Sequence, residues 1–596
     1  MTASSTPELR LPDPIRFSES LARVAERSQR LVTEFLARGP ADANLGMSDP
    51  ASVGSAFQAF TAQMLADPLT LARAQIGLWN EQMLLWQRAA QRLFGVADAA
   101  GEPVSDRRFR NPAWSENAIF DYIKQSYLVT AGSILSTVRQ VEGLDDKTAH
   151  KVEFYTRQFV DAIAPSNFLA SNPEVLQATL RTGGENLLHG LENLLGDLER
   201  GKGRLSIAMT DMTAFRPGEN IVTTPGQVIY QNELMQLIQY EPATEKVRRT
   251  PLLIVPPWIN KFYVLDLRPE NSFIRWAVAQ GHSVFVISWI NPDERLSEKS
   301  FEDYMRQGPL EALDAIEAAT GERGANMIGY CLGGTLLATT LAYLTAKGEE
   351  RVRSATYFVS LVDFTEVGDM AVFIDEEQLK ALEARMSERG YLQAHDMANS
   401  FNMLRANDLI WSFVVNNYLL GKEPVPFDLL YWNADATRMP AAMHSFYLRN
   451  MYHENRLSKP GGITLAGVPI DLRLITTPTF ILSTREDHIA PWRSTYAATQ
   501  IYGGPVKFVL AASGHIAGII SPPGSKYGHW QNSALPKEAD EWFRNATAVQ
   551  GSWWPIWDEW VSDFSGGEVK ARKPGGRKLK PLEAAPGSYV RIRATE

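Results

Sequence analysis

The sequence predicts an α/β catalytic domain built on a mostly parallel sheet, preceded by an all-α N-terminal domain. From about Leu205 onward, short apolar runs of strand length alternate with helical segments, which is typical of a sheet with helices on both faces. Before that point, residues 15–200 carry apolar residues at helical spacing almost throughout. A chain of 596 residues is also too long for a single core, so two or more domains are expected.

The N-terminal helical domain is assigned to residues 1–203, which hold no candidate catalytic cluster. Residues 1–14 are polar and are expected to be disordered. Helices are expected at about 17–38, 52–94, 117–139, 145–164 and 173–198, with a break in the second at Asp67-Pro68. The wide apolar face of residues 52–94 indicates either a core helix of a bundle or a helix that binds a partner.

The catalytic domain is assigned to residues 204–565. Its expected strands are 252–255, 283–288, 326–329, 355–360, 478–483 and 506–510, with helices such as 272–280 and 301–320 between them. Residues 364–474 interrupt this alternation with helical stretches and many aromatic residues, and are expected to form a cap over the site. Residues 566–596, rich in Lys, Arg, Gly and Pro, are predicted to be a mobile basic tail.

Composition and charge exclude several classes of protein. The single Cys leaves no intrachain disulfide. There is no signal-peptide core and no apolar run long enough to span a bilayer, so a cytoplasmic protein is expected. A net charge of −9 argues against general nucleic-acid binding. The sequence has neither a pair of His at helical spacing nor a Cys cluster, so no metal and no other cofactor is expected.

The strongest functional motif is Gly329-x-Cys331-x-Gly333, which follows an expected strand and precedes an apolar helical stretch. Strand, sharp turn and helix are the context of a nucleophile elbow, in which small neighbours let strand and helix pack closely. A lone Cys is otherwise often a small buried apolar residue. The glycine spacing favours a nucleophile, provided that an acid and a His follow in the chain.

An acid and a His do follow, each on a loop after an expected strand. Asp487 comes after residues 478–483, and His515 comes after residues 506–510. The order Cys331, Asp487, His515 is the nucleophile–acid–His order of the α/β-hydrolase fold, with His515 as base and Asp487 as the acid that orients it. Glu486 is the alternative acid.

An oxyanion hole requires two backbone N–H donors near the nucleophile. The N–H of Leu332, at the start of the helix after Cys331, is the first candidate. The second should come from the loop after residues 252–255, where Pro256 and Pro257 have no N–H. Trp258 and Ile259 remain open, and Ile259 is the donor that we predict.

The choice of Cys at the elbow indicates the kind of acyl donor. A thiolate is a good nucleophile near neutral pH. Transfer of an acyl group from a thioester to Cys331 is nearly isoenergetic, because one thioester replaces another. The acyl group then keeps its activation for a second transfer, whereas a Ser would hold it as an ordinary ester. The residue therefore favours acyl transfer from a thioester over simple hydrolysis.

Motifs along nearly the whole chain resemble those of the polyhydroxyalkanoate synthases. Tyr330 within the elbow is similar to the class I enzymes, which make short-chain polymers such as poly(3-hydroxybutyrate). The stretches that carry the resemblance are Asp106-Arg107-Arg108-Phe109 with Trp114, Ala164-Pro165-Ser166-Asn167, Thr223-Thr224-Pro225-Gly226, Pro256-Pro257-Trp258-Ile259-Asn260, Ser288-Trp289, Gly329-Tyr330-Cys331-Leu332-Gly333, Arg405-Ala406-Asn407-Asp408, Asp487-His488 and Ser513-Gly514-His515.

The resemblance implies an acyltransferase that polymerises (R)-3-hydroxyacyl-CoA, here 3-hydroxybutyryl-CoA, into polyester with release of CoA through an acyl-Cys331 intermediate. His515 and Asp487 match the family's base and acid. Arg405 lies where contact with a CoA phosphate is expected, and a structural ion pair is the alternative. Trp432 matches a position associated with dimer contact, and a core position in the cap is the alternative.

The resemblance also implies a homodimer located in the cytoplasm at the surface of polyester granules. Its N-terminal domain would serve dimerisation and contact with the granule or with a granule-associated protein such as a phasin. The basic C-terminal tail departs from the apolar end usual in the family, which leaves granule contact by the tail open. Alternatives are an acyl-CoA thioesterase or polyester depolymerase on the same fold, or a non-catalytic granule protein, which an intact Cys, Asp and His disfavour.

Overall fold

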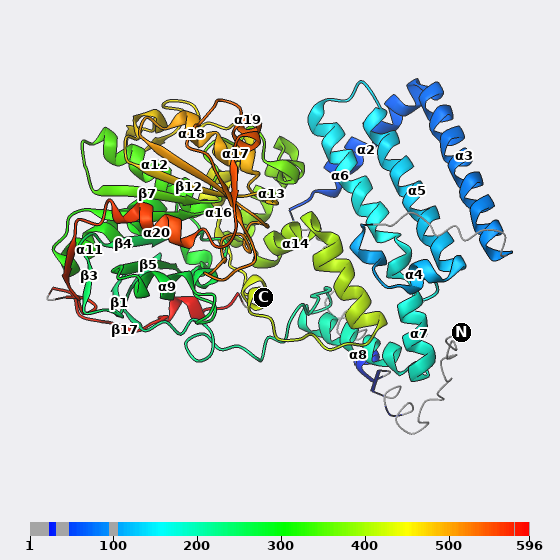
Figure 1. Cartoon of the computed structure of the whole chain (residues 1–596), viewed down its shortest axis with the longest axis horizontal. Coiled ribbons are helices and arrows are strands. Elements are labelled where there is room, and N and C mark those ends of the chain that lie inside the picture. Colours follow the sequence, from blue (N-terminus) through cyan, green and yellow to red (C-terminus); the bar gives the residue numbers. More distant parts are fainter. Residues whose placement is uncertain are drawn as a thin grey trace. The chain divides into compact units, whose positions relative to one another are not determined.

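The computed structural model describes residues 19, 23–24, 26–30, 47–94, 105–576 and 578–594. The prediction for residues 1–14 and most of the expected helix 17–38 lie outside the described residues. The chain divides into two units, Met1–Asp211 with Asn399–Val425, and Met212–Ala398 with Pro426–Glu596 (Figure 1). We call them the helical unit and the catalytic unit. The boundary thus lies a few residues beyond the expected residue 203.

The helical unit contains the helices that the sequence predicts. They are α2 (Pro50–Ala66), α3 (Pro68–Leu93), α5 (Ala118–Gln140), α6 (Asp146–Ala162), α7 (Pro173–Thr182) and α8 (Glu185–Arg200). The break between α2 and α3 falls at Asp67, whose carboxylate accepts from the N–H of Thr70 at 3.2 Å and so caps α3.

The wide apolar region of residues 52–94 divides between two environments. Ala56 and Phe60 of α2 are buried in a small core with Val152 of α6. Helix α3 packs along α5, where Gln82 Nε2 donates to the carbonyl of Ser126 at 3.1 Å, but it has no buried residue. Its exposed large apolar side chains include Leu69, Ile76, Trp79, Leu84 and Trp86. The bundle-core interpretation therefore holds for α2, and α3 retains an apolar surface.

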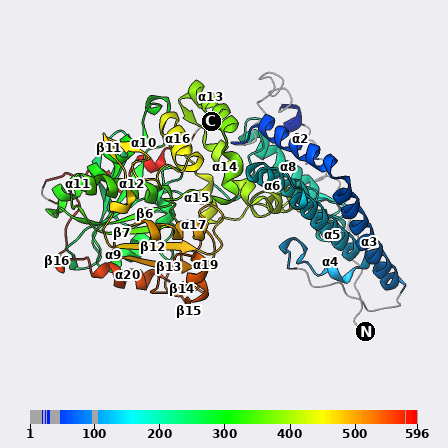
Figure 2. The same cartoon turned by 90° about the horizontal axis from the view of Figure 1, so that it is seen from above.

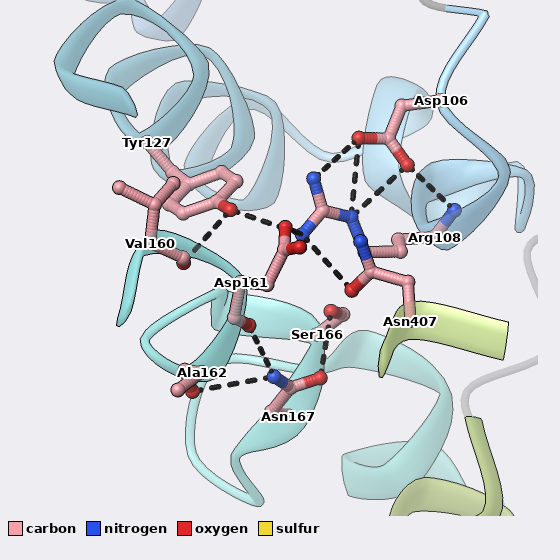
Figure 3. A network of polar contacts seen from close by, with 9 residues as sticks. All are labelled: Asp106, Arg108, Tyr127, Val160, Asp161, Ala162, Ser166, Asn167 and Asn407. Atoms are coloured by element: carbon pink, nitrogen blue, oxygen red, sulfur yellow. Dashed lines mark hydrogen bonds and ion pairs between the residues drawn. The ribbon is translucent and has the colours of Figure 1, made fainter. Parts of the chain in front are cut away.

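Three stretches of the helical unit that are far apart in the sequence meet at Arg108 (Figure 3). The Arg108 guanidinium pairs with Asp106 at 2.7 Å and with Asp161 at 3.0 Å. It also donates to the hydroxyl of Tyr127 at 3.0 Å and to the amide oxygen of Asn407 at 3.5 Å. Because the side chain is largely buried, these partners tie residue 407 to the N-terminal helices.

Residues 399–425 were expected to belong to the cap, but they pack within the helical unit. Asn186 of α8 donates from Nδ2 to the carbonyl of Leu419 at 2.7 Å. A Cβ at Gly190 would lie 1.8 Å from the carbonyl oxygen of Tyr418, so only glycine permits this approach. The sequence alone did not reveal that this segment belongs to the helical unit, because the residues on both sides of it belong to the catalytic unit.

The catalytic unit is built on a large sheet with the strand order β15-β14-β13-β12-β7-β6-β4-β5-β2-β1-β17. Its six central strands are parallel and correspond to the six expected runs. They are β4 (Leu252–Val255), β5 (Val284–Trp289), β6 (Ala325–Tyr330), β7 (Val352–Phe358), β12 (Thr479–Thr484) and β13 (Val506–Ala511). Antiparallel strands β1 (Gly226–Gln231), β2 (Met235–Tyr240), β14 (His529–Gln531) and β15 (Thr547–Val549) extend the sheet on both sides.

Helices cover both faces of this sheet. Figure 2 shows α12 (Leu332–Ala346) on one side of the central strands and α9 (Phe273–Ala279) with α20 (Trp554–Ser562) on the other. Phe273 of α9 packs against Trp553, Trp554 and Trp557, with ring centroids 5.2 to 5.9 Å apart. The expected helix 301–320 consists of α10 (Phe301–Met305), a π-helical turn that contains Pro309, and α11 (Glu311–Thr320).

The described residues 566–576 and 578–594 are structured, contrary to the predicted mobile tail. Strand β16 (Glu568–Lys570) pairs with β3 (Lys246–Arg248), and β17 (Glu583–Ala584) pairs with β1. The side chain of Val590 is buried. Strand pairing depends on backbone groups, so a polar and basic composition did not reveal it.

The part of the cap that stays in the catalytic unit contains α13 (Glu376–Arg389), α15 (Asp428–Ala434), α16 (Ala441–Tyr447) and the π-helical segment η9 (Leu448–His453). Trp432 on α15 is buried, and its indole N–H donates to the carbonyl of Lys261 at 2.7 Å. Within this chain Trp432 is therefore a core residue of the cap.

No helix among the described residues is long and apolar enough to cross a membrane.

Candidate active site

Cys331 occupies a strained turn between β6 and α12. Its φ of 52° and ψ of −120° lie in a region that residues other than Gly rarely adopt, and its N–H donates to the carbonyl of Phe358 at 2.9 Å. Strain at a residue that connects a strand to a helix is what a nucleophile elbow requires. The structure thus gives Cys331 the backbone geometry that the motif predicts.

Both glycines of the motif are needed for close packing at this turn. A Cβ at Gly329 would lie 2.4 Å from the Cα of Gly334, and a Cβ at Gly333 would lie 2.0 Å from the carbonyl oxygen of Val255. These distances are shorter than any real contact, so larger residues would push α12 away from β6 and from the end of β4. The Gly-x-Cys-x-Gly spacing is therefore explained by sterics.

Asp487 and His515 meet at the carboxyl edge of the sheet. Asp487 follows β12 and His515 follows β13, its parallel neighbour. The Nδ1 atom of His515 lies 2.8 Å from Oδ2 of Asp487, and both side chains are buried. The other carboxylate oxygen of Asp487 accepts from the N–H groups of Ile489 and Ala490 at 2.9 Å each. Asp487 is thus held in one orientation by four donors that include the hydroxyl of Thr484.

The charges of this pair stabilise each other. Burial alone would raise the pKa of Asp487, but His515 and the backbone donors outweigh it and lower that pKa. Burial alone would lower the pKa of His515, but Asp487 and Cys331 outweigh it and raise the pKa to about 10. The imidazole also interacts electrostatically with Cys331. His515 therefore connects the acid to the thiol.

Glu486, the alternative acid, has a different environment. Its side chain is exposed, and its backbone N–H donates to the carbonyl of Ser513 at 3.0 Å. It braces the loop that carries His515 rather than facing the imidazole. Of the two carboxylates, the structure brings Asp487 to His515.

The two predicted oxyanion donors lie on segments that meet at the elbow. Leu332 is the first residue of α12, and the loop with Ile259 follows β4, whose end contacts Gly333. Thr437 of the cap binds the carbonyls of Trp258 and Ile259 at 2.8 and 2.6 Å, which fixes this loop. Among the described residues, neither Leu332 nor Ile259 donates its N–H to another backbone carbonyl. Both assignments remain predictions.

Arg405, the predicted substrate-binding residue, lies in the helical unit. Its guanidinium pairs with Asp408 one turn away, with Nε 3.0 Å from the carboxylate, and both side chains are substantially exposed. The structural ion pair, which was the alternative, is present. Contact of Arg405 with CoA remains a prediction.

Sequence reasoning did not identify two tyrosines of the cap. The phenols of Tyr447 and Tyr452 both interact electrostatically with Cys331. The local sequence indicated only that residues 364–474 are rich in aromatic side chains, and no motif singled out these two. Their rings are 5.9 Å apart, and the hydroxyl of Tyr447 donates to Thr335 in the first turn of α12, contacts that the local sequence does not indicate. Among the described residues, no cluster of three or more His, Cys, Asp or Glu could hold a metal.

Comparison with known proteins now gives the family. The model described as the poly-beta-hydroxybutyrate polymerase (PhaC) N-terminus matches residues 105–277, and that of the alpha/beta hydrolase fold matches residues 250–522. A poly(3-hydroxyalkanoate) polymerase subunit of Rhizobium meliloti is 49% identical over 98% of this chain and 96% of its own length. The chain belongs to the poly(3-hydroxyalkanoate) polymerase family.

Other members of this polymerase family are similar over most of the chain. The polymerase of Methylorubrum extorquens is 52% identical over 89% of this chain and 88% of its own. The polymerase subunit of Cupriavidus necator is 42% identical over 88% of this chain and 90% of its own. The chain is therefore an acyltransferase of polyhydroxyalkanoate synthesis with an α/β-hydrolase fold, as the sequence predicts.

Proposed function

We propose that this polymerase elongates polyester from (R)-3-hydroxyacyl-CoA, with 3-hydroxybutyryl-CoA as the preferred substrate, through an acyl group held on Cys331. The observation that carries the proposal is the 2.8 Å pairing of Asp487 with His515, whose imidazole also interacts electrostatically with Cys331 at the strained elbow. A thiol held in this way suits attack on a thioester, for the energetic reason given above.

In the first step, His515 holds the proton of the Cys331 thiol, because its raised pKa favours the imidazolium form at neutral pH. The thiolate attacks the thioester carbonyl and forms a tetrahedral intermediate, whose oxyanion would accept from the N–H groups of Leu332 and Ile259. When the carbon–sulfur bond to CoA breaks, the leaving thiolate takes the proton from His515. Asp487 keeps the imidazole oriented and stabilises its charge throughout.

In the second step, the 3-hydroxyl of one acyl unit attacks the thioester carbonyl of another. The new ester bond forms as the carbon–sulfur bond breaks, and the hydroxyl proton passes through a base, either His515 or Asp487, to the leaving sulfur. With one Cys per chain, two covalently held acyl groups would require the Cys331 of a second chain. Otherwise one acyl group stays covalent while the other is bound as the CoA thioester. The aromatic cap is suited to excluding water, which would hydrolyse the acyl-enzyme.

The proposal includes a homodimer acting in the cytoplasm at the granule surface, with a granule-associated protein such as a phasin as partner. The apolar surface of α3, with Ile76, Trp79, Leu84 and Trp86 exposed, supports an apolar contact of this kind. Arg405 would contact a CoA phosphate.

The test follows CoA release from (R)-3-hydroxybutyryl-CoA in the wild type and in Cys331→Ala, with recovery of the acyl product. Release together with insoluble polyester, lost in Cys331→Ala, is the expected result. Release with only free 3-hydroxybutyrate would make the chain a thioesterase. Release only from a longer acyl chain would keep the mechanism and overturn the short-chain preference.

A further inference from the structure

Two tyrosines of the cap, Tyr447 and Tyr452, form an aromatic cluster with Phe364 beside the nucleophile. Tyr447 ends α16, Tyr452 lies in η9, and their ring centroids are 5.9 Å apart. The ring of Phe364 lies 6.1 Å from Tyr447 and 5.0 Å from Tyr452. Both phenols interact electrostatically with Cys331, so the cluster belongs to the surroundings of the thiol.

The hydroxyl of Tyr447 has a partner within the protein. It lies 3.3 Å from Oγ1 of Thr335, which itself donates to the carbonyl of Leu361 at 2.7 Å. Thr335 belongs to the first turn of α12, and its N–H donates to the carbonyl of Cys331 at 3.3 Å. Tyr447 therefore ties the cap to the helix that starts at the nucleophile.

The hydroxyl of Tyr452 is in a different situation. It makes no hydrogen bond to any residue that the structure describes, although the side chain is partly buried. Its phenol interacts with Asp487 as well as with Cys331. Burial, Cys331 and Asp487 raise the pKa of Tyr452, so the hydroxyl keeps its proton at neutral pH. Tyr452 thus offers a hydroxyl donor with no acceptor among the described residues, in a cluster that Tyr447 ties to the helix starting at the nucleophile.

We propose that Tyr452 donates a hydrogen bond to the 3-hydroxyl oxygen of the acyl group at Cys331 and so selects 3-hydroxyacyl thioesters. The inference rests on the proposed function. The thioester carbonyl is assigned to the backbone donors Leu332 and Ile259. The 3-hydroxyl must instead lie near His515 and Asp487, because one of them takes its proton. A donor that interacts with both Cys331 and Asp487 suits this second oxygen.

The chemistry of the second step strengthens the assignment. When the 3-hydroxyl loses its proton, negative charge develops on the same oxygen. A neutral phenol stabilises that charge, whereas a carboxylate would repel it. A site built to bind a hydroxyl also rejects the analogue without one, because its own donor is then left unpaired. Tyr452 is therefore expected to act in both substrate choice and elongation.

The test is single-turnover CoA release from (R)-3-hydroxybutyryl-CoA and from butyryl-CoA, which lacks the 3-hydroxyl. The wild type should prefer the hydroxy substrate by on the order of tenfold in kcat/KM, and Tyr452→Phe should abolish the preference by slowing that substrate alone. Tyr447→Phe is the matched control. It removes a hydroxyl that already has a partner, so it should lower the melting temperature and leave the preference intact.

Several outcomes would overturn the inference. One is an equal loss of kcat/KM with both substrates in Tyr452→Phe, and another is no loss with either. A third is a wild type that shows no preference, and this outcome does not depend on the folding of any variant. Loss of the preference in Tyr447→Phe would show that Tyr447, and not Tyr452, binds the 3-hydroxyl. Failure of the proposed function is distinguishable, because the wild type would then release no CoA, or Cys331→Ala would still release it.

Discussion

The imidazole of His515 lies 2.8 Å from the carboxylate of Asp487, and the same imidazole interacts electrostatically with Cys331. Residues separated by up to 184 positions in the chain thus come together at one edge of the sheet. The arrangement predicts which substitutions remove catalysis and which affect only stability.

Asp487→Asn should lower CoA release by on the order of 10³-fold, because the amide no longer stabilises the imidazolium. Steady-state assays with (R)-3-hydroxybutyryl-CoA measure the loss. Asp558→Asn is the matched control, because Asp558 forms a similar contact at 2.8 Å with His282, which is buried away from Cys331. It should reduce stability and leave kcat unchanged. An equal loss of kcat in both variants would contradict the assignment of Asp487.

The raised pKa of His515 makes stability depend on pH in a defined direction. Because its folded-state pKa is about 10, its contribution is fully present below its ordinary value of about 6.5 and is lost as pH rises through 10. Urea midpoints of the wild type should therefore fall between pH 7 and 10. His515→Gln should weaken the dependence of the unfolding free energy on pH by the amount that corresponds to close to one proton. An unchanged slope in the variant would contradict the raised pKa.

His444 on α16 predicts the opposite behaviour in acid. Its complete burial lowers its pKa to about 4. The contribution of the neutral imidazole to stability is therefore fully present above pH 6.5 and is lost as the pH falls toward 4. The expected loss is on the order of 3 kcal/mol. His444→Gln carries no titrating group, so its urea midpoint should change less between pH 7 and 4. Parallel profiles of wild type and variant would count against a buried neutral imidazole.

Gly190 holds the segment 399–425 against α8. Gly190→Ala places a Cβ where the carbonyl of Tyr418 lies and should destabilise the helical unit by about 2 kcal/mol or more. Faster hydrogen exchange in residues 407–419 is the readout. Gly132→Ala on α5 has open space around its Cβ and should stabilise instead, by about 0.5–1 kcal/mol. Unchanged exchange in Gly190→Ala would show that this contact is dispensable.

Thr437 fixes the loop that carries the predicted oxyanion donor. Thr437→Val removes the hydroxyl that binds the carbonyls of Trp258 and Ile259, and should lower kcat by on the order of tenfold with little change in KM. A change confined to KM would instead indicate a role in binding the substrate.

The sequence was sufficient for the parts of the fold that depend on local patterns. The six parallel strands were recognisable because each is an apolar run bounded by turn residues. The elbow was recognisable because its glycines have a steric cause, seen at Gly329 and Gly333. Asp487 and His515 could be chosen because both follow strands whose carboxyl ends meet at one edge.

What the sequence did not reveal depends on contacts between distant segments. The packing of residues 399–425 on α8 relies on Gly190, which has no local pattern to mark it. The strands β16 and β17 pair through backbone groups within a basic, glycine-rich stretch. Tyr452 joins the aromatic cluster with Phe364 and Tyr447 through the fold of the cap, so the role proposed for it could not be read from its neighbours in the chain.

The most direct test of the acyl-Cys331 account is mass spectrometry of the chain quenched during turnover of (R)-3-hydroxybutyryl-CoA. The account predicts 3-hydroxybutyryl units on the peptide that contains Cys331, lost on treatment with hydroxylamine and strongly reduced in His515→Gln. CoA release at the same rate without any adduct on that peptide would contradict it.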